Sequence, residues 1–242
     1  MTAGGGGLGV LVTRPDSSGT ARRLHALGHR PVLLPLSRVV ELEPGPNRNP
    51  AAVRAVAATS ANALRFCSPA LLDAMKGKPC FAVGEATARA AREKGFSRIQ
   101  VGEGDVQALA ERIGPHAAPL LYLCGRVRRP EFEDALARKG VMVRAVETYD
   151  TVAVEPSSAA LAEALDGRPV HAALLYSALG AEGFARLRQR ADAAALRGVS
   201  VLALSPRIAK AAGGGLAAKA PNEDALFALF EAWAASFQPG RV

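Results

Sequence analysis

The amino-acid sequence predicts an α/β protein with two similar lobes, each built on a parallel sheet, and a ligand cleft between them. Three short patterns occur in one order and then recur in that order. Strand-like apolar runs alternate with helix-like segments, which is typical of parallel sheets covered by helices on both faces. Only two segments, residues 36–44 and 147–156, interrupt this alternation.

The repeat consists of an apolar run that ends in Arg, a strand that ends in Ser before a short helix, and an apolar run before an Ala-rich helix. The matched segments are residues 10–34 and 122–146, 56–66 and 173–184, and 80–91 and 201–212. The paired positions, Arg14/Arg126, Ser60/Ser177 and Gly84/Ser205, are offset by 112, 117 and 121 residues. Three matches in the same order indicate two similar βα halves, and two lobes suggest a ligand held between them.

The elements expected in the first half follow the apolar runs. Strands at 10–13 and 31–35 flank a helix at 16–27, which a Gly follows. Residues 38–43 alternate polar and apolar side chains and end in the breaker PGPNRNP, so an extended segment is expected there. A new series then begins. It comprises strand 53–59, helices through residue 75, strand 80–83, helix 85–94, strand 99–101 and helix 105–113.

The second half repeats the alternation after strand 120–124, helix 131–139 and strand 141–146. Residues 147–155 form a second extended stretch that a Pro closes. The last series is helix 157–165, strand 171–176, helix 178–190, strand 201–204, helix 207–212, strand 217–220 and helix 223–236.

The domain boundaries need not follow the repeat. If residues 36–44 and 147–156 are both linkers, residues 45–146 form one compact lobe. Residues 1–35 must then pack with residues 157–242 to form the other lobe. Two chain crossings that run side by side would make a two-stranded hinge.

Composition indicates a globular protein of the cytoplasm. The 242 residues are 49% hydrophobic, and no apolar stretch approaches the ~20 residues that span a bilayer, so no membrane partner is expected. Cys67, Cys80 and Cys124 lack CxxC spacing and lie in or beside apolar segments. They are expected to be reduced thiols in the core, as in cytoplasmic proteins.

The net charge of +8 has two interpretations. It reflects either an Arg-rich solvated surface or selection for a polyanionic ligand, because guanidinium groups bind carboxylates and phosphates bidentately. A nucleic-acid partner is not expected, since aromatic residues make up only 5% and no zinc finger, RNA-binding signature or basic helix is present.

The candidate site follows from where the strands end, because ligands of open α/β sheets bind beyond the carboxyl ends of the strands. Small hydroxyls, glycines and arginines dominate these positions, and carboxylates are expected to be scarce there. The segments are Thr13-Arg14, residues 59–62, residues 83–85, residues 124–126, Tyr176-Ser177 and residues 205–207. Ser, Thr and Asn are also ordinary helix N-caps, so capping is the alternative role for each of them.

Several chemistries lack their motifs. The four histidines show no metal-ligand spacing, and GxGxxG, GxxxxGK[ST] and GxSxG are absent. A metal, a nucleotide or a nucleophilic serine is therefore not indicated.

The chain resembles the uroporphyrinogen-III synthases over nearly its whole length. The motifs that carry the resemblance are Thr13-Arg14-Pro15, ATSANALRF at 58–66, AVGEATARAA at 82–91 and ETYDT at 147–151. The segments GRVRRPEF and LSPRIAKAA match more loosely. In the latter, Ser-Pro-Arg stands where the first half has Gly-Glu-Ala.

This resemblance implies two flavodoxin-like lobes joined by a two-stranded linker, with the active site in the cleft. It implies that hydroxymethylbilane, a linear tetrapyrrole rich in carboxylates, loses water and cyclises with inversion of its terminal ring. No cofactor or metal takes part, and the enzyme is expected to be a monomer. The expected substrate-binding residues are Thr13, Arg14, Ser60, Asn62, Arg65, Gly84, Thr87, Arg126, Ser177 and Lys210.

Tyr149 is the expected catalytic residue, because it matches the Tyr of the family's ETYDT segment. Its phenol could donate a proton to the departing hydroxyl, or its ring could merely pack in the hinge. The competing hypothesis for the whole chain is a non-catalytic two-lobed protein that binds a small anionic ligand.

Overall fold

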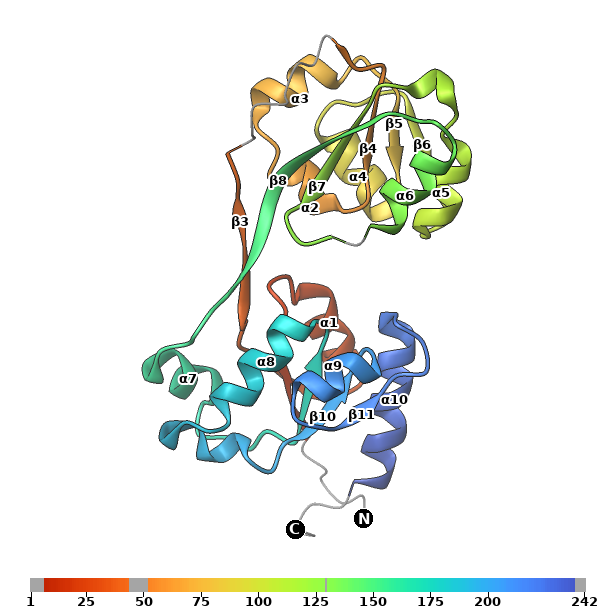
Figure 1. Cartoon of the computed structure of the whole chain (residues 1–242). Coiled ribbons are helices and arrows are strands. Elements are labelled where there is room, and N and C mark those ends of the chain that lie inside the picture. Colours follow the sequence, from red (N-terminus) through yellow and green to blue (C-terminus); the bar gives the residue numbers. More distant parts are fainter. Residues whose placement is uncertain (1–6, 44–51, 129, 238–242) are drawn as a thin grey trace. The chain divides into compact units, whose positions relative to one another are not determined.

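The computed structural model describes residues 7–43, 52–128 and 130–237. The chain divides into two compact units, which are unit 1 (Met1–Arg38 with Val152–Val242) and unit 2 (Val39–Thr151). In each unit helices cover a sheet of mainly parallel strands (Figure 1). The α/β class with two parallel-dominated sheets is therefore confirmed. The PGPNRNP segment, and with it the expected boundary at residue 45, lies outside the described residues.

Unit 1 contains a fully parallel sheet in the order β11-β10-β9-β1-β2. The strands are β1 (Gly9–Val12), β2 (Arg30–Leu33), β9 (Ala172–Leu175), β10 (Ser200–Ala203) and β11 (Leu216–Ala217). Every residue of β1 and β9 is buried, as expected for central strands that helices cover on both faces.

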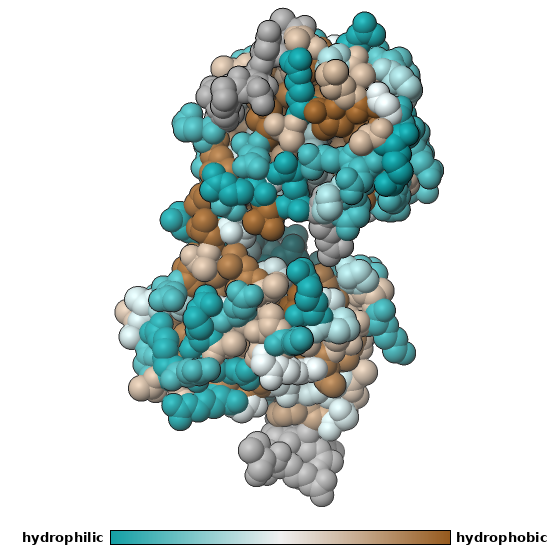
Figure 2. Space-filling view, in the orientation of Figure 1, coloured by the Kyte–Doolittle hydropathy of each residue, from teal (hydrophilic) through white to brown (hydrophobic). Residues whose placement is uncertain are grey.

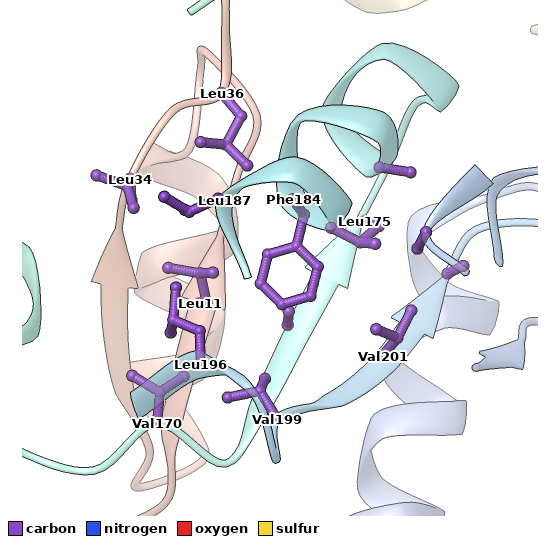
Figure 3. Packing of buried hydrophobic residues seen from close by; sticks show 14 of the residues in the cluster. Leu11, Leu34, Leu36, Val170, Leu175, Phe184, Leu187, Leu196, Val199 and Val201 are labelled. Carbon is purple, nitrogen blue, oxygen red and sulfur yellow. The ribbon is translucent and has the colours of Figure 1, made fainter. Parts of the chain in front are cut away.

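Two hydrophobic clusters hold the helices of unit 1 onto the sheet. On one face, α7 (Ser158–Leu165), α8 (Ala178–Leu187) and α9 (Pro206–Ala211) pack around Phe184, whose ring lies among Leu11, Leu175 and Leu196 (Figure 3). On the other face, α1 (Ser18–Ala26) and α10 (Glu223–Ser236) contribute Leu24, Phe227 and Phe230.

Unit 2 contains a sheet in the order β3-β8-β7-β4-β5-β6. The strands are β3 (Ser37–Glu41), β4 (Ala55–Ala58), β5 (Cys80–Ala82), β6 (Ile99–Val101), β7 (Leu120–Gly125) and β8 (Val143–Ala153). The helices α2 (Ala61–Arg65), α3 (Pro69–Met75) and α4 (Glu85–Glu93) pack on one face. On the other face lie α5 (Val106–Arg112) and α6 (Glu131–Arg138).

The two sheets share one strand order. In unit 1 the order β2-β1-β9-β10-β11 is the 2-1-3-4-5 order of flavodoxin-like sheets. The corresponding order β8-β7-β4-β5-β6 in unit 2 is a circular permutation of it, because the strands equivalent to β1 and β2 come last in that unit. The sequence repeat pairs four of these five corresponding strands, and β6 with β11 is the pair that it does not cover. With β3 left aside, each unit therefore combines two strands from one half of the chain with three from the other, and the repeat does not coincide with the units.

The largest difference from the expected elements concerns β8. The sequence predicted a strand at 141–146 and a separate extended linker strand at 147–156, but residues Val143–Ala153 form one continuous strand of 11 residues. Its Val and Thr residues favour extended backbone, and it is hydrogen-bonded between β7 and β3. The amide of Leu42, just beyond β3, donates to the carbonyl of Thr148 at 3.0 Å.

Smaller differences concern helix ends. The helix expected at 178–190 ends at Leu187, because Arg190 leaves the helix, donates to the carbonyl of Pro156 and pairs with Asp192. Two 3₁₀ helices, Pro115–Ala117 and Ala191–Leu196, were not expected. The strand expected at 217–220 is reduced to two residues, Leu216–Ala217.

The three cysteines are buried and unpaired, as expected from the sequence. Burial raises the pKa of each thiol to about 12, so all three are protonated at neutral pH. They are core residues rather than nucleophiles.

The exposed large hydrophobic side chains are scattered, and the most exposed are Val127, Met142 and Leu216. Hydrophilic side chains cover much of the visible face of each unit (Figure 2). Within the described residues, no helix combines the length and the apolar character needed to cross a membrane.

Candidate functional site

Five of the candidate residues lie around the switch point of each sheet, where the strand order reverses. The switch point lies between β1 and β9 in unit 1 and between β7 and β4 in unit 2. Thr13-Arg14 and Ser177 follow the first pair of strands, and Arg126 and Ser60 follow the second. Ligands of doubly wound sheets bind beyond the strands at this place. We therefore describe one candidate half-site in each unit.

In unit 1, two hydroxyls meet at the first turn of α8. Ser177 caps the helix by accepting the Gly180 amide at 3.1 Å, and the Thr13 hydroxyl donates to the carbonyl of Leu174 at 3.4 Å. A Cβ atom at Gly180 would lie 3.3 Å from Ser177 Oγ and 3.5 Å from Thr13 Oγ1. The absence of a side chain at Gly180 therefore leaves space beside both hydroxyls, and both also serve the fold.

Arg14 is held by a carboxylate that the sequence analysis did not foresee. Glu223, the first residue of α10, accepts from the Thr20 hydroxyl at 2.6 Å and from the Tyr176 hydroxyl at 3.2 Å. The Arg14 Nη1 atom lies 3.5 Å from the same Oε1 atom, and the guanidinium carbon lies 4.6 Å from the centroid of the Tyr176 ring. The Arg14 side chain is 36% exposed, so it is oriented and still reachable by an anion.

Burial raises the pKa of Tyr176 to about 12, and the nearby Glu223 charge acts in the same direction. The phenol is therefore neutral at physiological pH, and its hydroxyl donates a hydrogen bond to Glu223. No sequence signal links Glu223 to Arg14, because 209 residues separate them.

The remaining candidates of unit 1 lie on α9. Ser205 is the N-cap residue of this helix, but its side chain makes no capping hydrogen bond. Lys210 lies in the last turn and is exposed. At 1.5 Å of rise per residue, its Cα atom lies roughly 7.5 Å along the helix from that of Ser205, away from the strand ends.

In unit 2, the helix starts that follow β4 and β5 carry the candidates. Ser60 caps α2 by accepting the Asn62 amide at 3.2 Å. Gly84 caps α4 with extended backbone, and Thr87 in its first turn is buried. Arg65 is exposed at the opposite end of α2 from Ser60, so it stands apart from the other candidates.

Carboxylates surround Arg126, which corrects the expectation that they are scarce at the strand ends. Its guanidinium lies 3.2 Å from Asp150 Oδ2 and 3.5 Å from Glu147 Oε2. The neighbouring Arg128 pairs with Glu147 at 2.9 Å and with Glu133 at 3.0 Å, and these hydrogen bonds raise its pKa. The acidic residues come from β8 and α6, which the sequence analysis did not place beside the end of β7.

A β-bulge sets the direction of Tyr149. Cys124 pairs with Glu147 and Gly125 pairs with Tyr149, so Thr148 is the extra residue of β8. Thr148 is fully buried and donates its hydroxyl to the carbonyl of Ala63 at 2.9 Å. Without the bulge, Tyr149 would point to the face opposite Thr148; instead both side chains lie on the α2 face.

The Tyr149 ring lies flat against Gly125. A Cβ atom at Gly125 would lie 2.7 Å from Tyr149 Cζ, so this position has room only for hydrogen. The amide of Arg126 donates to the carbonyl of Tyr149 at 2.9 Å, and the ring of Phe66 lies 6.4 Å from that of Tyr149. The Tyr149 hydroxyl has no hydrogen-bond partner among the described residues, and the side chain is partly exposed. The ring therefore packs against Gly125, and within the described residues the hydroxyl makes no hydrogen bond, so the role of Tyr149 stays a prediction.

Two cavities of unit 1 lie away from these residues. One, of about 640 Å³, lies at the amino ends of β1, β2 and β9, and another, of about 160 Å³, is lined by residues of α8 and by Val154–Pro156. Neither contains an expected site residue. In residues 7–43, 52–128 and 130–237, no group of three or more His, Cys, Asp or Glu side chains is placed to hold a metal ion.

Two comparisons with known proteins give matches. A family model described as uroporphyrinogen-III synthase HemD matches residues 18–228. A mutant uroporphyrinogen III synthase from the extremely thermophilic bacterium Thermus thermophilus is 20% identical, covers 95% of this chain and 100% of its own, and gives a TM-score of 0.52. Uroporphyrinogen-III synthetase from Helicobacter pylori is 15% identical, covers 93% and 99%, and gives 0.64. At these identities the structures show a shared fold. A comparison with curated proteins finds no match.

The contact between Gly125 and Tyr149 yields a stability prediction. Gly125→Ala should lower the free energy of unfolding by about 1–3 kcal/mol, because the new methyl group overlaps the ring. On a Tyr149→Ala background the same change should cost nothing, since the overlap is gone. Urea titrations of the four proteins measure this coupling.

The control is Gly19→Ala in α1, where an added Cβ meets no atom within 4 Å. It should stabilise the protein by about 0.5–1 kcal/mol, because Ala is a better helix former than Gly. An equal cost of Gly125→Ala with and without the Tyr149 ring would show that the ring does not occupy this position.

Proposed function

The chain belongs to the uroporphyrinogen-III synthase family, and we propose that it converts hydroxymethylbilane into uroporphyrinogen III. In this reaction the terminal hydroxyl leaves as water, the chain of four pyrroles closes, and the last ring is inverted. The observation that carries the proposal is the family match from residue 18 to residue 228. We further propose that the enzyme is a cofactor-independent lyase that acts as a cytoplasmic monomer and does not bind nucleic acid.

The substrate is rich in carboxylates, and the switch points offer groups suited to bind them. Arg14 is 36% exposed and Arg126 is 56% exposed, and each is oriented by a neighbouring carboxylate. A guanidinium held in this way loses little freedom when it binds a substrate carboxylate. The amides at the starts of α2, α4 and α8 add further donors to anions.

Glu147 and Glu223 have a second consequence for binding. Each competes with substrate for its arginine, because an exposed ion pair is worth at most about 1 kcal/mol and is readily exchanged. Without substrate, these carboxylates keep the two arginines paired and oriented. When substrate binds, each arginine exchanges its weak ion pair for charge-assisted hydrogen bonds to a substrate carboxylate.

Ring closure without inversion also takes place spontaneously, so the protein must favour one conformation of the chain. Fixing the reacting atoms can lower the barrier by several kcal/mol, up to roughly 7–11 kcal/mol. In this proposal most of the catalysis is positioning by arginines, hydroxyls and helix starts.

Tyr149 is the proposed general acid. Its hydroxyl has no partner within the described part of the chain, while the bulge at Thr148 and the contact with Gly125 hold its ring. A proton given to the departing hydroxyl would convert it into water, a better leaving group. The alternative of a non-catalytic anion-binding protein has no observation that favours it.

The first test is the product. Incubated with freshly prepared hydroxymethylbilane and a metal chelator, the protein should yield the type III isomer, which chromatography separates from type I. Type I alone, formed no faster than in buffer, would remove the enzyme hypothesis and favour the binding protein.

The second test concerns the arginines. Arg14→Ala and Arg126→Ala should each weaken substrate binding by about tenfold or more, since a charge-assisted hydrogen bond contributes about 1.5–3 kcal/mol. Arg65→Ala should have a smaller effect, because Arg65 lies at the far end of α2. KM values at two salt concentrations measure these effects.

Arg197→Ala is the matched control, since Arg197 is exposed and precedes the amino end of β10. Its KM should equal that of the parent protein. Unchanged KM values for Arg14→Ala and Arg126→Ala would show that substrate binds elsewhere.

The third test separates proton donation from packing at Tyr149. Tyr149→Phe keeps the ring against Gly125 and removes the proton, so kcat should fall by about 10²-fold if the phenol is the general acid. The product should shift towards type I, because spontaneous closure then competes. Full activity with pure type III product would reduce Tyr149 to a packing residue, and an unchanged melting temperature controls for folding.

A further inference from the structure

A second candidate site lies at the amino ends of the strands of the unit 1 sheet, whereas the switch-point residues follow the carboxyl ends. This amino-edge pocket has a volume of about 640 Å³, within the range of small-molecule sites. Three segments form it, namely the chain entering β1, the turn from α1 to β2, and the turn from α7 to β9. Its lining residues are Gly7, His25, Gly28, His29, Arg30, Arg168, Pro169 and His171.

Glycines allow these three segments to pack closely. A Cβ atom at Gly9 would lie 2.2 Å from the carbonyl oxygen of Pro169, and one at Gly7 would lie 1.8 Å from that of Gly28. Gly28 ends α1 with a φ of 78°, a conformation that glycine adopts without strain. The walls are therefore backbone in direct contact, which holds the side chains of the pocket in place.

Two histidines are fixed in one tautomer. The Nδ1 atom of His171 accepts the Gly9 amide at 2.9 Å, and that of His29 accepts the Leu8 amide at 3.3 Å. A neutral imidazole that accepts at Nδ1 carries its proton at Nε2, so both rings present an N–H donor. Burial lowers the pKa of His29, although the charge of Glu231 opposes this shift, so the neutral donor form is favoured.

The charged side chains that line the pocket, Arg30 and Arg168, are both positive. Arg30 donates to the carbonyl of Pro169 at 2.9 Å. Burial and the charge of Arg168 lower the pKa of Arg30, and the charge of Asp166 opposes this shift. Arg168 pairs with Asp166 at 2.6 Å, but both side chains are more than half exposed, so the pair is weak. No carboxylate lines the pocket among the residues that the structure describes. The two guanidiniums therefore repel each other, and the only counter-charge shown beside them among the described residues is the exposed carboxylate of Asp166.

We propose that the amino-edge pocket binds a small molecule carrying a multiply charged oxyanion, either a phosphate group or clustered carboxylates. An anion between Arg30 and Arg168 would relieve their repulsion and accept bidentate hydrogen bonds. The Nε2–H groups of His29 and His171 are the further donors. This inference is independent of the proposed function, because the pocket contains none of the switch-point residues.

Calorimetry tests the charge requirement with inorganic diphosphate and citrate as probes. At low salt we expect saturable binding of at least one probe, and the tighter probe identifies the oxyanion as phosphate or carboxylate. Arg30→Gln and Arg168→Gln should each weaken this binding by about tenfold or more, whereas Arg197→Gln, at another exposed arginine of unit 1, should not.

Imidazole ¹H–¹⁵N spectra locate the site. The tighter probe should shift the signals of His25, His29 and His171 and leave that of His116, which lies in unit 2, unchanged. The spectrum of His116→Asn identifies the reference signal.

Three results would overturn the proposal. One is the absence of saturable binding by either probe. Another is an equal loss in Arg197→Gln, which indicates general attraction to a basic surface. The third is a loss in Arg126→Gln without one in Arg30→Gln, which places the anion at a switch point.

Discussion

Neither half of the chain can complete a sheet, and this constraint organises both the fold and the candidate site. The central strand β1 pairs with β2 from its own half and with β9 from the other half. In the same way β7 pairs with β8 and with β4. Because buried backbone groups must be hydrogen-bonded, each unit requires strands from both halves.

The seam between the two halves is also the switch point of each sheet. Thr13 and Arg14 from the first half meet Ser177 from the second, and Ser60 from the first half lies beside the strand that leads to Arg126. The groups proposed to bind substrate therefore come together only when the halves pair. The fold and the proposed binding groups depend on the same strand pairs, β1 with β9 and β4 with β7.

A β-bulge in unit 2 and a long-range contact in unit 1 place the remaining side chains of the two half-sites. In unit 2 one extra residue in β8 turns the Tyr149 ring towards α2, and Gly125 is the neighbour that makes room for it. In unit 1 the start of α10 brings Glu223 to Arg14, Thr20 and Tyr176. The two half-sites follow one plan, in which a carboxylate from a distant element orients an arginine at a strand end. They differ in the aromatic residue that accompanies it.

The sequence by itself determined the α/β class, the repeat, and the position of Thr13, Arg14, Ser60, Ser177 and Arg126 at strand ends. These features follow from short-range patterns, because apolar runs and the caps behind them are read over a few residues. The tertiary structure alone decided that β8 is one continuous strand with a bulge, and that Glu223 and Glu147 hold the arginines. It alone brought three histidines and two arginines to one pocket. These features depend on backbone pairing and on contacts between residues far apart in the chain, such as the 209 residues between Arg14 and Glu223, and no local pattern encodes such contacts.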